Sequence, residues 1–297
     1  MNTAGPDLNL LQTFFAVHAA GGVSAAAQRL GVSQPTVSHA LRRLRDLYQD
    51  PLFIRTGAGM APTAKADRLA EAVRHALHLL DVAIQEGGHF DAGAAQRTFR
   101  LHMTDIGETV FLPRLMHTLA ARAPGLRIET AQLDEKDIGP ALETGRIDAA
   151  VGYFPALAAL PTVPLLRERY VVLMRRGHPQ AGRAPTRAAL RQLDYVVVRS
   201  HPATERALRE LGAAANIRLS MPHFLVLPRI IAETDLAVLM PERLASVFGS
   251  MGAYVVWRPR VGLPSFDVSL HWSRRFEGDP GLRWLRERMI ELFREGT

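Results

Sequence analysis

The beginning of the chain places apolar side chains at helical spacing, and this pattern predicts three short helices. The segment 8–20 directs several large side chains to one face, and these are Leu11, Phe14, Phe15 and His18. The segment 23–30 has a small apolar face made by Ala26, Ala27 and Leu30, and Ser24 is expected to cap it. A third helix from residue 34 directs Val37, Leu41 and Leu44 to the core at spacing i, i+4, i+7.

The second and third of these helices are joined by a tight turn. Gly31 suits the left-handed position that follows a helix end, and Ser33 can cap the next helix. Pro35 falls in the first turn of that helix, where the missing N–H costs little. Residues 23–42 therefore predict a helix-turn-helix.

The outward face of the third helix is polar. Pro35, His39 and Arg42 point away from the core, and Thr36, Ser38 and Arg43 lie on the flanks. Hydroxyl, imidazole and guanidinium groups on one face are suited to a helix in the DNA major groove. The alternative is a solvated helical hairpin without a nucleic-acid partner.

Residues 50–62 predict a strand followed by a glycine-bearing turn, the pattern of a wing. Arg55 would lie at its tip or base, where it could enter a minor groove or bind phosphate. An ordinary surface arginine is the alternative.

A long helix is expected after Thr63. Its apolar positions alternate steps of four and three, as in a coiled-coil seam, and they are Ala66, Ala70, Val73, Leu77, Leu80 and Ile84. This stripe predicts pairing with a second copy of the chain, and packing on its own domain is the alternative. His75 and His78 have spacing that permits a metal pair, but exposed imidazoles are usually solvated.

Residues 87–96 predict a hinge, and beyond it strand and helix patterns alternate. Strands are expected near 99–103, 126–133, 147–153, 170–174, 195–198, 236–240 and 254–257. Helices are expected around 112–119, 138–143 and 282–292. This alternation indicates an α/β architecture with largely parallel sheets, in two subdomains with a ligand-binding cleft between them.

The composition of the chain says less about its function than the sequence patterns do. The 297-residue chain has a formal charge of +7, which is compatible with a polyanionic partner but is spread along the sequence. The absence of cysteine excludes disulfides and Cys-ligated zinc and fits a reducing compartment. No basic leader precedes Arg29 and no apolar run has transmembrane length, so we expect a cytoplasmic protein without membrane contact.

The chain carries none of the common catalytic or nucleotide-binding motifs. We therefore expect no enzyme activity, no metal and no cofactor beyond a small-molecule effector. A solute-binding protein with merely structural N-terminal helices is the alternative function, and it would require export.

Residues 7–11, 34–41, 50–55 and 59–63 closely resemble LysR-type transcriptional regulators. Residues 97–107, 122–125, 145–148, 221–224 and 234–236 resemble the NahR/NodD-like branch, many members of which respond to aromatic compounds. The resemblance extends over essentially the whole chain. It implies a winged helix-turn-helix joined to a bilobal, periplasmic-binding-protein-like α/β effector domain.

The resemblance also implies boundaries and partners. The DNA-binding domain would span 7–63, the dimerisation helix 64–88 and the effector domain 97–297. Within the latter, lobe 1 would comprise 97–166 and 267–297, and lobe 2 would comprise 167–266. Expected partners are double-stranded promoter DNA, further copies of the chain in a homodimer or homotetramer, and RNA polymerase.

Matching motif positions imply the site residues. The DNA contacts would be Ser33, Gln34, Pro35, Thr36, Ser38, His39, Arg42, Arg43 and, in the wing, Arg55. The effector contacts would be Thr104, Asp105, Tyr153, Glu168, Ser200, His201, His223 and Phe224. Thr104 begins a helix whose free N–H groups favour an anion. Glu168 departs from the branch, because salicylate-responsive relatives tend to carry histidine there, and this departure argues against a benzoate-like ligand.

Overall fold

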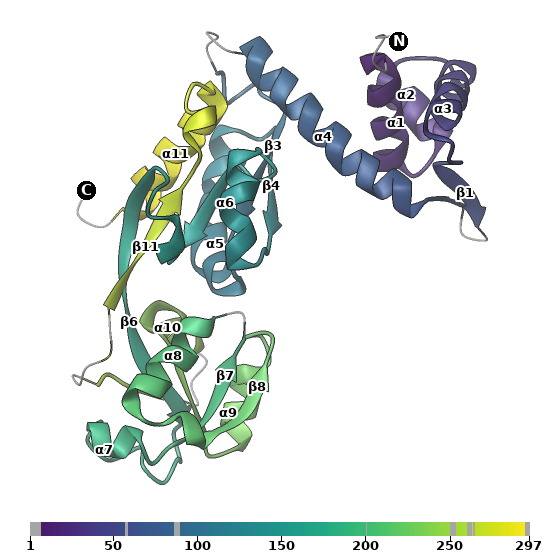
Figure 1. The fold of residues 1–297 in the computed structure, drawn as a ribbon. Helices are drawn as coiled ribbons and strands as arrows, with labels where there is room; N and C mark the ends of the chain where they lie inside the picture. The colour runs from purple at the N-terminus through teal and green to yellow at the C-terminus, as the bar shows by residue number, and fades with distance from the viewer. Residues whose placement is uncertain are drawn as a thin grey trace. The chain divides into compact units, whose positions relative to one another are not determined.

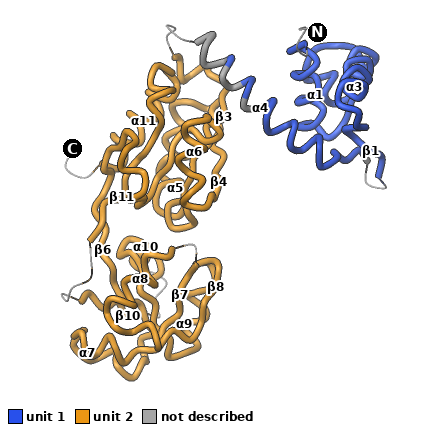
Figure 2. The backbone as a smooth tube through the Cα atoms, in the orientation of Figure 1, with its two compact units in different colours: residues 1–86 blue, residues 87–297 orange. Residues whose placement is uncertain are grey.

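The computed structural model describes residues 7–56, 59–85, 90–199, 201–249, 254–259, 263 and 265–294. The chain divides into two compact units, residues 1–86 and 87–297, shown in different colours in Figure 2. Within the described residues, no helix is both long and apolar enough to cross a membrane.

The first unit is a helical bundle with a two-stranded wing. Its elements are α1 (Leu8–Ala20), α2 (Val23–Leu30), α3 (Gln34–Tyr48), β1 (Phe53–Thr56), β2 (Gly59–Pro62) and α4 (Ala64–Gln85). Gly31 takes the expected left-handed conformation, with φ of 66°, and the Ser33 hydroxyl accepts a hydrogen bond from the Thr36 amide. Ser24 does not cap α2. The helix begins at Val23, so Gly22 is its N-cap and Ser24 lies inside the helix.

The core of the first unit confirms the expected inward face of α3. Val37, Leu41 and Leu44 are buried, together with Leu10, Phe14 and Val17 of α1 and the two alanines of α2. The buried face of α1 differs from the expected one by about one position along the helix. Leu11, Phe15 and His18, which were expected on that face, are only partly buried. Leu30 is exposed, which limits the apolar face of α2 to Ala26 and Ala27.

The apolar stripe of α4 is divided along its length. Ala66, Ala70 and Val73 are buried in the core of the first unit, so this part of the stripe packs on its own domain. Leu80, further along, is exposed. The side chains of Ile84, His75 and His78 lie outside the described residues.

The second unit contains two α/β lobes (Figure 1). The first lobe contains β3 (Arg97–His102), α5 (Asp105–Arg122), β4 (Leu126–Ala131), α6 (Glu135–Glu143), β5 (Ala149–Gly152) and, from the end of the chain, β11 (Ser265–His271) and α11 (Pro280–Phe293). The second contains α7 (Arg187–Leu190), β7 (Asp194–Val198), α8 (Pro202–Leu211), β8 (Ile217–Met221), α9 (Leu227–Glu233), β9 (Leu236–Pro241), α10 (Glu242–Gly249) and β10 (Tyr254–Trp257).

One long strand, β6 (Thr162–Arg175), joins the two lobes. Its first part pairs with β11 from Thr162 to Arg169, and from Tyr170 onward it pairs with β9 and β10. The strand order is β4-β3-β5-β11-β6-β9-β7-β8, with β10 also on β6. Each lobe has its own apolar clusters on the two faces of its sheet.

The expectation of largely parallel sheets was wrong. The β3–β4, β3–β5, β7–β8 and β7–β9 pairs are parallel, but β6 and β11 make only antiparallel pairs. The chain passes between the lobes through β6 and next to β11, and these two strands are antiparallel to each other. The sheet of each lobe therefore contains both parallel and antiparallel pairs. The expected hinge is also shorter, because Phe90, Ala92 and Ala95 pack against the core of the first lobe. Gly87 and Gly88 lie outside the described residues.

Candidate functional site

The first unit presents one continuous polar helix face. All the residues expected to contact DNA on α3 are exposed, namely Ser33, Gln34, Pro35, Thr36, Ser38, His39, Arg42 and Arg43. Within the described part of the chain, the side chains of Arg42 and Arg43 have neither a hydrogen bond nor an ion pair. Their guanidinium groups are available to an external partner.

The wing begins from a rigid base. The Asp50 carboxylate accepts hydrogen bonds from the Leu52 amide at 2.7 Å and the Thr63 hydroxyl at 2.8 Å. Both hydrogen bonds lower the pKa of Asp50, and the bond from Leu52 has the larger effect. Arg55 lies on β1 opposite Met60 and is exposed, and its side chain has no hydrogen bond or ion pair in the described residues. By contrast, the side chains of Arg45 and Lys65 donate to backbone carbonyls of their own domain.

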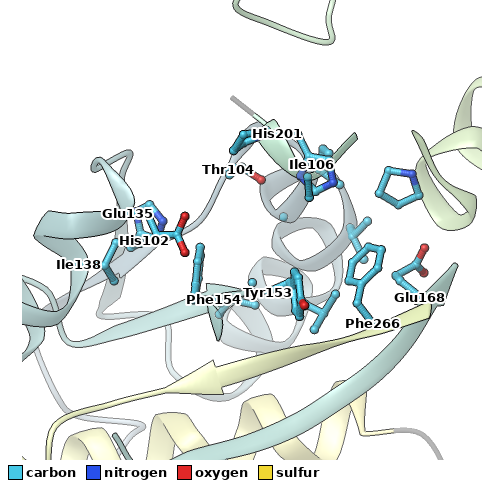
Figure 3. A pocket seen from close by; sticks show the side chains of 18 of the residues that line it. His102, Thr104, Ile106, Glu135, Ile138, Tyr153, Phe154, Glu168, His201 and Phe266 are labelled. Atoms are coloured by element: carbon cyan, nitrogen blue, oxygen red, sulfur yellow. The ribbon is translucent and has the colours of Figure 1, made fainter. Parts of the chain in front are cut away.

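The second unit contains a cavity of about 460 Å³ lined by both lobes. Thr104, Tyr153, Glu168 and His201, four of the residues expected to contact an effector, line it (Figure 3). The wall also contains residues not anticipated from the sequence, among them His102, Ile106, Phe111, Glu135, Phe154, Arg199, Arg206, Arg243 and Phe266.

Thr104 is the N-cap residue of α5, and its side chain makes no capping hydrogen bond. A plain helix cap would have used the hydroxyl for that purpose. Thr104 lines the cavity instead (Figure 3), beside the N–H groups of the first turn of an 18-residue helix. A hydroxyl and a helix N-terminus thus lie together in the cavity wall, next to the Asp105 carboxylate, which accepts a hydrogen bond from the Ile106 amide.

Aromatic rings form one wall of the cavity. The Phe154 ring lies 5.2 Å from the His102 ring and 5.8 Å from the His271 ring, measured between centroids. Burial lowers the pKa of both histidines, so they are neutral at pH 7. Gly152 makes room for this arrangement, because a Cβ there would lie 2.4 Å from the Phe154 ring.

His201 lies between Tyr170 and the cavity. Its Nε2 is 3.3 Å from the Tyr170 hydroxyl, and burial lowers the pKa of His201 to about 4. Burial also raises the pKa of Tyr170, so both groups are neutral at pH 7. His201 can therefore offer a ligand a neutral donor or acceptor.

Glu168 is buried but not isolated. Its Oε1 lies 2.9 Å from Nε of Arg243, and the backbone amide of Arg243 donates to Oε2. Burial raises the pKa of Glu168, and the hydrogen bond and charge of Arg243 oppose that shift. Glu168 thus comes with its own counter-ion, which weakens the expectation that this acid disfavours an anionic ligand.

Three expected effector contacts do not line the cavity, and they are Asp105, His223 and Phe224. His223 is exposed, and its neighbour Phe224 is buried in the second lobe with its ring centroid 6.5 Å from that of His201. The Phe224 amide donates to Asp105, and this bond holds the backbone so that Phe224, not His223, faces inward. Ser200 lies outside the described residues.

The comparisons with known proteins agree with this division. A model of the bacterial regulatory helix-turn-helix protein, lysR family, matches residues 8–67, and the LysR substrate binding domain model matches residues 92–294. The solved structure of a probable transcriptional regulator from Pseudomonas aeruginosa, PA0477, has a TM-score of 0.79 and 31% identity, and covers 96% of this chain and 97% of that one.

Two curated relatives match along almost their full length. The transcriptional activator NahR of Pseudomonas putida is 39% identical over 97% of either chain. The transcriptional activator NagR of a Ralstonia species is 37% identical over 97% of this chain and 98% of its own. Full-length CbnR complexed with its target DNA has the same fold, with a TM-score of 0.66, 17% identity, and coverage of 96% and 99%. The chain belongs to the LysR family of DNA-binding transcriptional regulators, with an N-terminal helix-turn-helix and an effector-binding domain.

Proposed function

We propose that α3 enters the major groove of promoter DNA and that Arg55 contacts the adjacent backbone or minor groove. Gln34, Pro35, Ser38, His39 and Arg42 would contact base edges, with Ser33, Thr36 and Arg43 on the flanks. The exposure of this whole face supports the assignment. Phosphate contacts would position the helix, and base contacts would supply sequence preference.

We further propose that the effector is a small aromatic carboxylate bound between the lobes. The single observation that carries this proposal is the Thr104 end of the cavity, where an uncommitted hydroxyl meets the N-terminus of α5 beside an aromatic wall. The resemblance to the aromatic-responsive branch points to the same ligand class. His201 is neutral and Glu168 is paired with Arg243, so neither adds an unpaired negative charge to the cavity.

Replacement of Thr104 by valine tests the effector proposal. Calorimetry on the full chain should detect binding of benzoate or 2-hydroxybenzoate, and Thr104→Val should weaken it roughly tenfold by removing a hydrogen bond to a charged group. Thr118→Val on the same helix is the control, because that hydroxyl donates to the Arg114 carbonyl. DNA affinity should be unchanged in both variants. Failure of every aromatic carboxylate to bind the wild-type protein would refute the proposal.

The assembly and cellular setting belong to the same proposal. Residues 7–63 would form the DNA-binding domain, 64–88 the dimerisation helix and 97–297 the effector domain, divided into lobes at 166/167 and 266/267. The chain would act as a homodimer or homotetramer that contacts RNA polymerase at promoters in the bacterial cytoplasm. We expect the effector to be released unchanged, because the protein acts as a regulator and not as an enzyme.

A further inference from the structure

A second cavity, of about 470 Å³, lies in the effector-binding unit next to the one between the lobes. The described residues that line it are all polar, and they comprise three arginines, two glutamates and two serines. Two of them, Glu168 and Arg243, line both cavities. The first cavity has aromatic and aliphatic walls, so the second one is suited to a different kind of ligand.

The second cavity lies where the strand that joins the lobes meets α10. Successive side chains of a strand point to opposite faces, so Arg167 and Arg169 of β6 share one face and Glu168 lies between them on the other. Ser265 of β11 is the register partner of Arg169. The start of α10 contributes the remaining residues, and they are Glu242, Arg243 and Ser246. Three segments that are distant along the chain thus form the cavity.

Two ion pairs hold α10 against β6. Arg169 donates from Nε to the carboxylate of Glu242, and Nε of Arg243 lies 2.9 Å from Oε1 of Glu168. The hydrogen bond between them lowers the pKa of Glu242 and raises the pKa of Arg169, so both groups are charged at pH 7. Each of these pairs joins one cation to one anion, and together they explain why one arginine lies on each element.

The arginines at the cavity nevertheless outnumber the acids. Arg258, which follows β10, also donates to Glu242 at 2.5 Å, so one carboxylate binds two guanidinium groups. Arg167 donates to the Ser265 hydroxyl at 2.8 and 3.2 Å. Asp267, opposite Arg167 in the register, is exposed and does not line the cavity. Four formal positive charges and two negative ones therefore meet here.

The surrounding lobe adds to this positive charge. Residues 167–266 contain fifteen arginines and seven acidic residues, whereas the rest of the chain is close to neutral. The formal charge of +7 thus comes from this lobe and is not spread evenly along the sequence. An excess of one sign raises the local concentration of ions of the opposite sign. The whole lobe therefore favours an anion at the cavity.

The donors at the cavity are suited to an oxyanion. A guanidinium group presents several N–H donors in a planar fork that matches the oxygens of a phosphate. Arg169 uses Nε for Glu242, and its side chain is 61% exposed, so its other N–H groups can be reached from solvent. The Ser265 hydroxyl accepts both bonds from Arg167, and its own hydrogen is therefore available to an acceptor.

From this arrangement we infer that the second cavity binds a phosphate group, either as free phosphate or as the phosphate of a small metabolite. Arg167 and Arg169 bind its oxygens from β6, Arg243 binds them from α10, and the Ser265 hydroxyl donates to it. A doubly charged phosphate matches the excess of two positive charges, whereas a carboxylate matches only half of it. This site uses different donors from the proposed aromatic-acid site and does not depend on it.

Calorimetry with the full chain at pH 7.5 tests the inference. The probes are inorganic phosphate, sulfate and glycerol 3-phosphate, with acetate as the singly charged reference, all at one ionic strength. We expect the dianions to bind at one saturable site roughly tenfold or more tightly than acetate. Tighter binding of glycerol 3-phosphate than of phosphate assigns the site to phosphorylated metabolites, and equal binding assigns it to phosphate itself. Both results support the inference.

Substitutions locate the site. Arg169→Gln removes donors and a positive charge, and Ser265→Asp adds a negative charge, so each should weaken phosphate binding by roughly tenfold or more. Arg183→Gln is the matched control, because Arg183 is an exposed arginine of the same lobe that does not line the cavity. This control changes the net charge as Arg169→Gln does and should bind phosphate like the wild type. Circular dichroism checks that the variants are folded.

Two results would overturn the inference. If no dianion binds more tightly than acetate, the cavity is not a phosphate site. If a folded Arg169→Gln or Ser265→Asp variant binds phosphate as the wild type does, the anion binds elsewhere on the chain. The use of two substitutions, one on β6 and one on β11, keeps the test decisive if either variant fails to fold.

Discussion

The carboxylate of Asp105, at the start of α5 in the first lobe, accepts a hydrogen bond of 3.0 Å from the backbone amide of Phe224 in the second lobe. The same carboxylate raises the pKa of His201 through its charge, against the larger effect of burial. Asp105 does not line the cavity, yet it connects the two lobes next to the residues that do.

Loss of this connection should loosen the two lobes. For Asp105→Ala we expect a decrease of about 1–2 kcal/mol in the free energy of unfolding of the effector-binding unit, because a partly exposed hydrogen bond to a charged group is lost. Asp105→Asn keeps a neutral acceptor and should cost less. Urea denaturation followed by tryptophan fluorescence measures both. Equal effects of the two substitutions would show that the acceptor does not matter.

Gly152 should tolerate no side chain. A Cβ at this position would lie 2.4 Å from the Phe154 ring, which is held between two histidine rings and cannot move freely. Gly152→Ala should therefore destabilise the effector-binding unit by about 1–3 kcal/mol through overpacking and should weaken effector binding. Gly182→Ala is the control, since a Cβ there meets nothing within 4 Å. Similar melting temperatures for the two variants would contradict the prediction.

The buried histidines should make stability depend on pH. Burial lowers the pKa of His201 from 6.5 to about 4, so the unfolded chain binds more protons than the folded one between these values. Stability is then complete above pH 6.5 and is lost as the pH falls toward 4, by an amount on the order of 3 kcal/mol for this residue. The lowered pKa values of His102 and His271 act in the same direction.

A comparison of wild type with His201→Gln isolates this contribution. Thermal unfolding between pH 4.5 and 7.5 should show a shallower loss of stability for the variant at acidic pH. An identical pH dependence of the two proteins would mean that His201 is protonated as readily in the folded state as in the unfolded one.

The sequence was most informative where structure depends on near neighbours. Gly31, Ser33 and Pro35 act through local backbone rules, and the structure places all three as expected. The inward positions Val37 and Leu41 follow from helical periodicity in the same way.

The residues that line the cavity were harder to predict from the sequence, because they are brought together by pairings between segments that are distant along the chain. Glu168 comes opposite Phe266 only through the β6–β11 register, and Arg243 reaches Glu168 from the helix α10. His223 points outward because its neighbour Phe224 is anchored by Asp105, 119 positions earlier in the chain. A short motif does not reveal which of two adjacent side chains is buried in the lobe and which is exposed.

The wing arginine should contribute affinity without sequence preference. Arg55→Ala should weaken binding to every promoter fragment and reduce the slope of log K against log salt by about 0.9, the value for one lost phosphate contact. Lys136→Ala, in the effector-binding unit, should change neither quantity. Fluorescence anisotropy at several salt concentrations makes the measurement. An unchanged slope for Arg55→Ala would mean that Arg55 makes no contact with a DNA phosphate.

The exposed end of the α4 stripe should hold two copies of the chain together. Ala66, Ala70 and Val73 are already used by the core of the first unit, whereas Leu80 is 38% exposed. A charge at position 80 would lose its hydration in a helix pair but keep it in a monomer. Leu80→Glu should therefore weaken dimerisation tenfold or more, which corresponds to roughly 1.4 kcal/mol. Ala76→Glu, exposed on the same helix but off the stripe, is the matched control. Sedimentation equilibrium measures the association, and a dimer equally stable in both variants would mean that the end of α4 is not the interface.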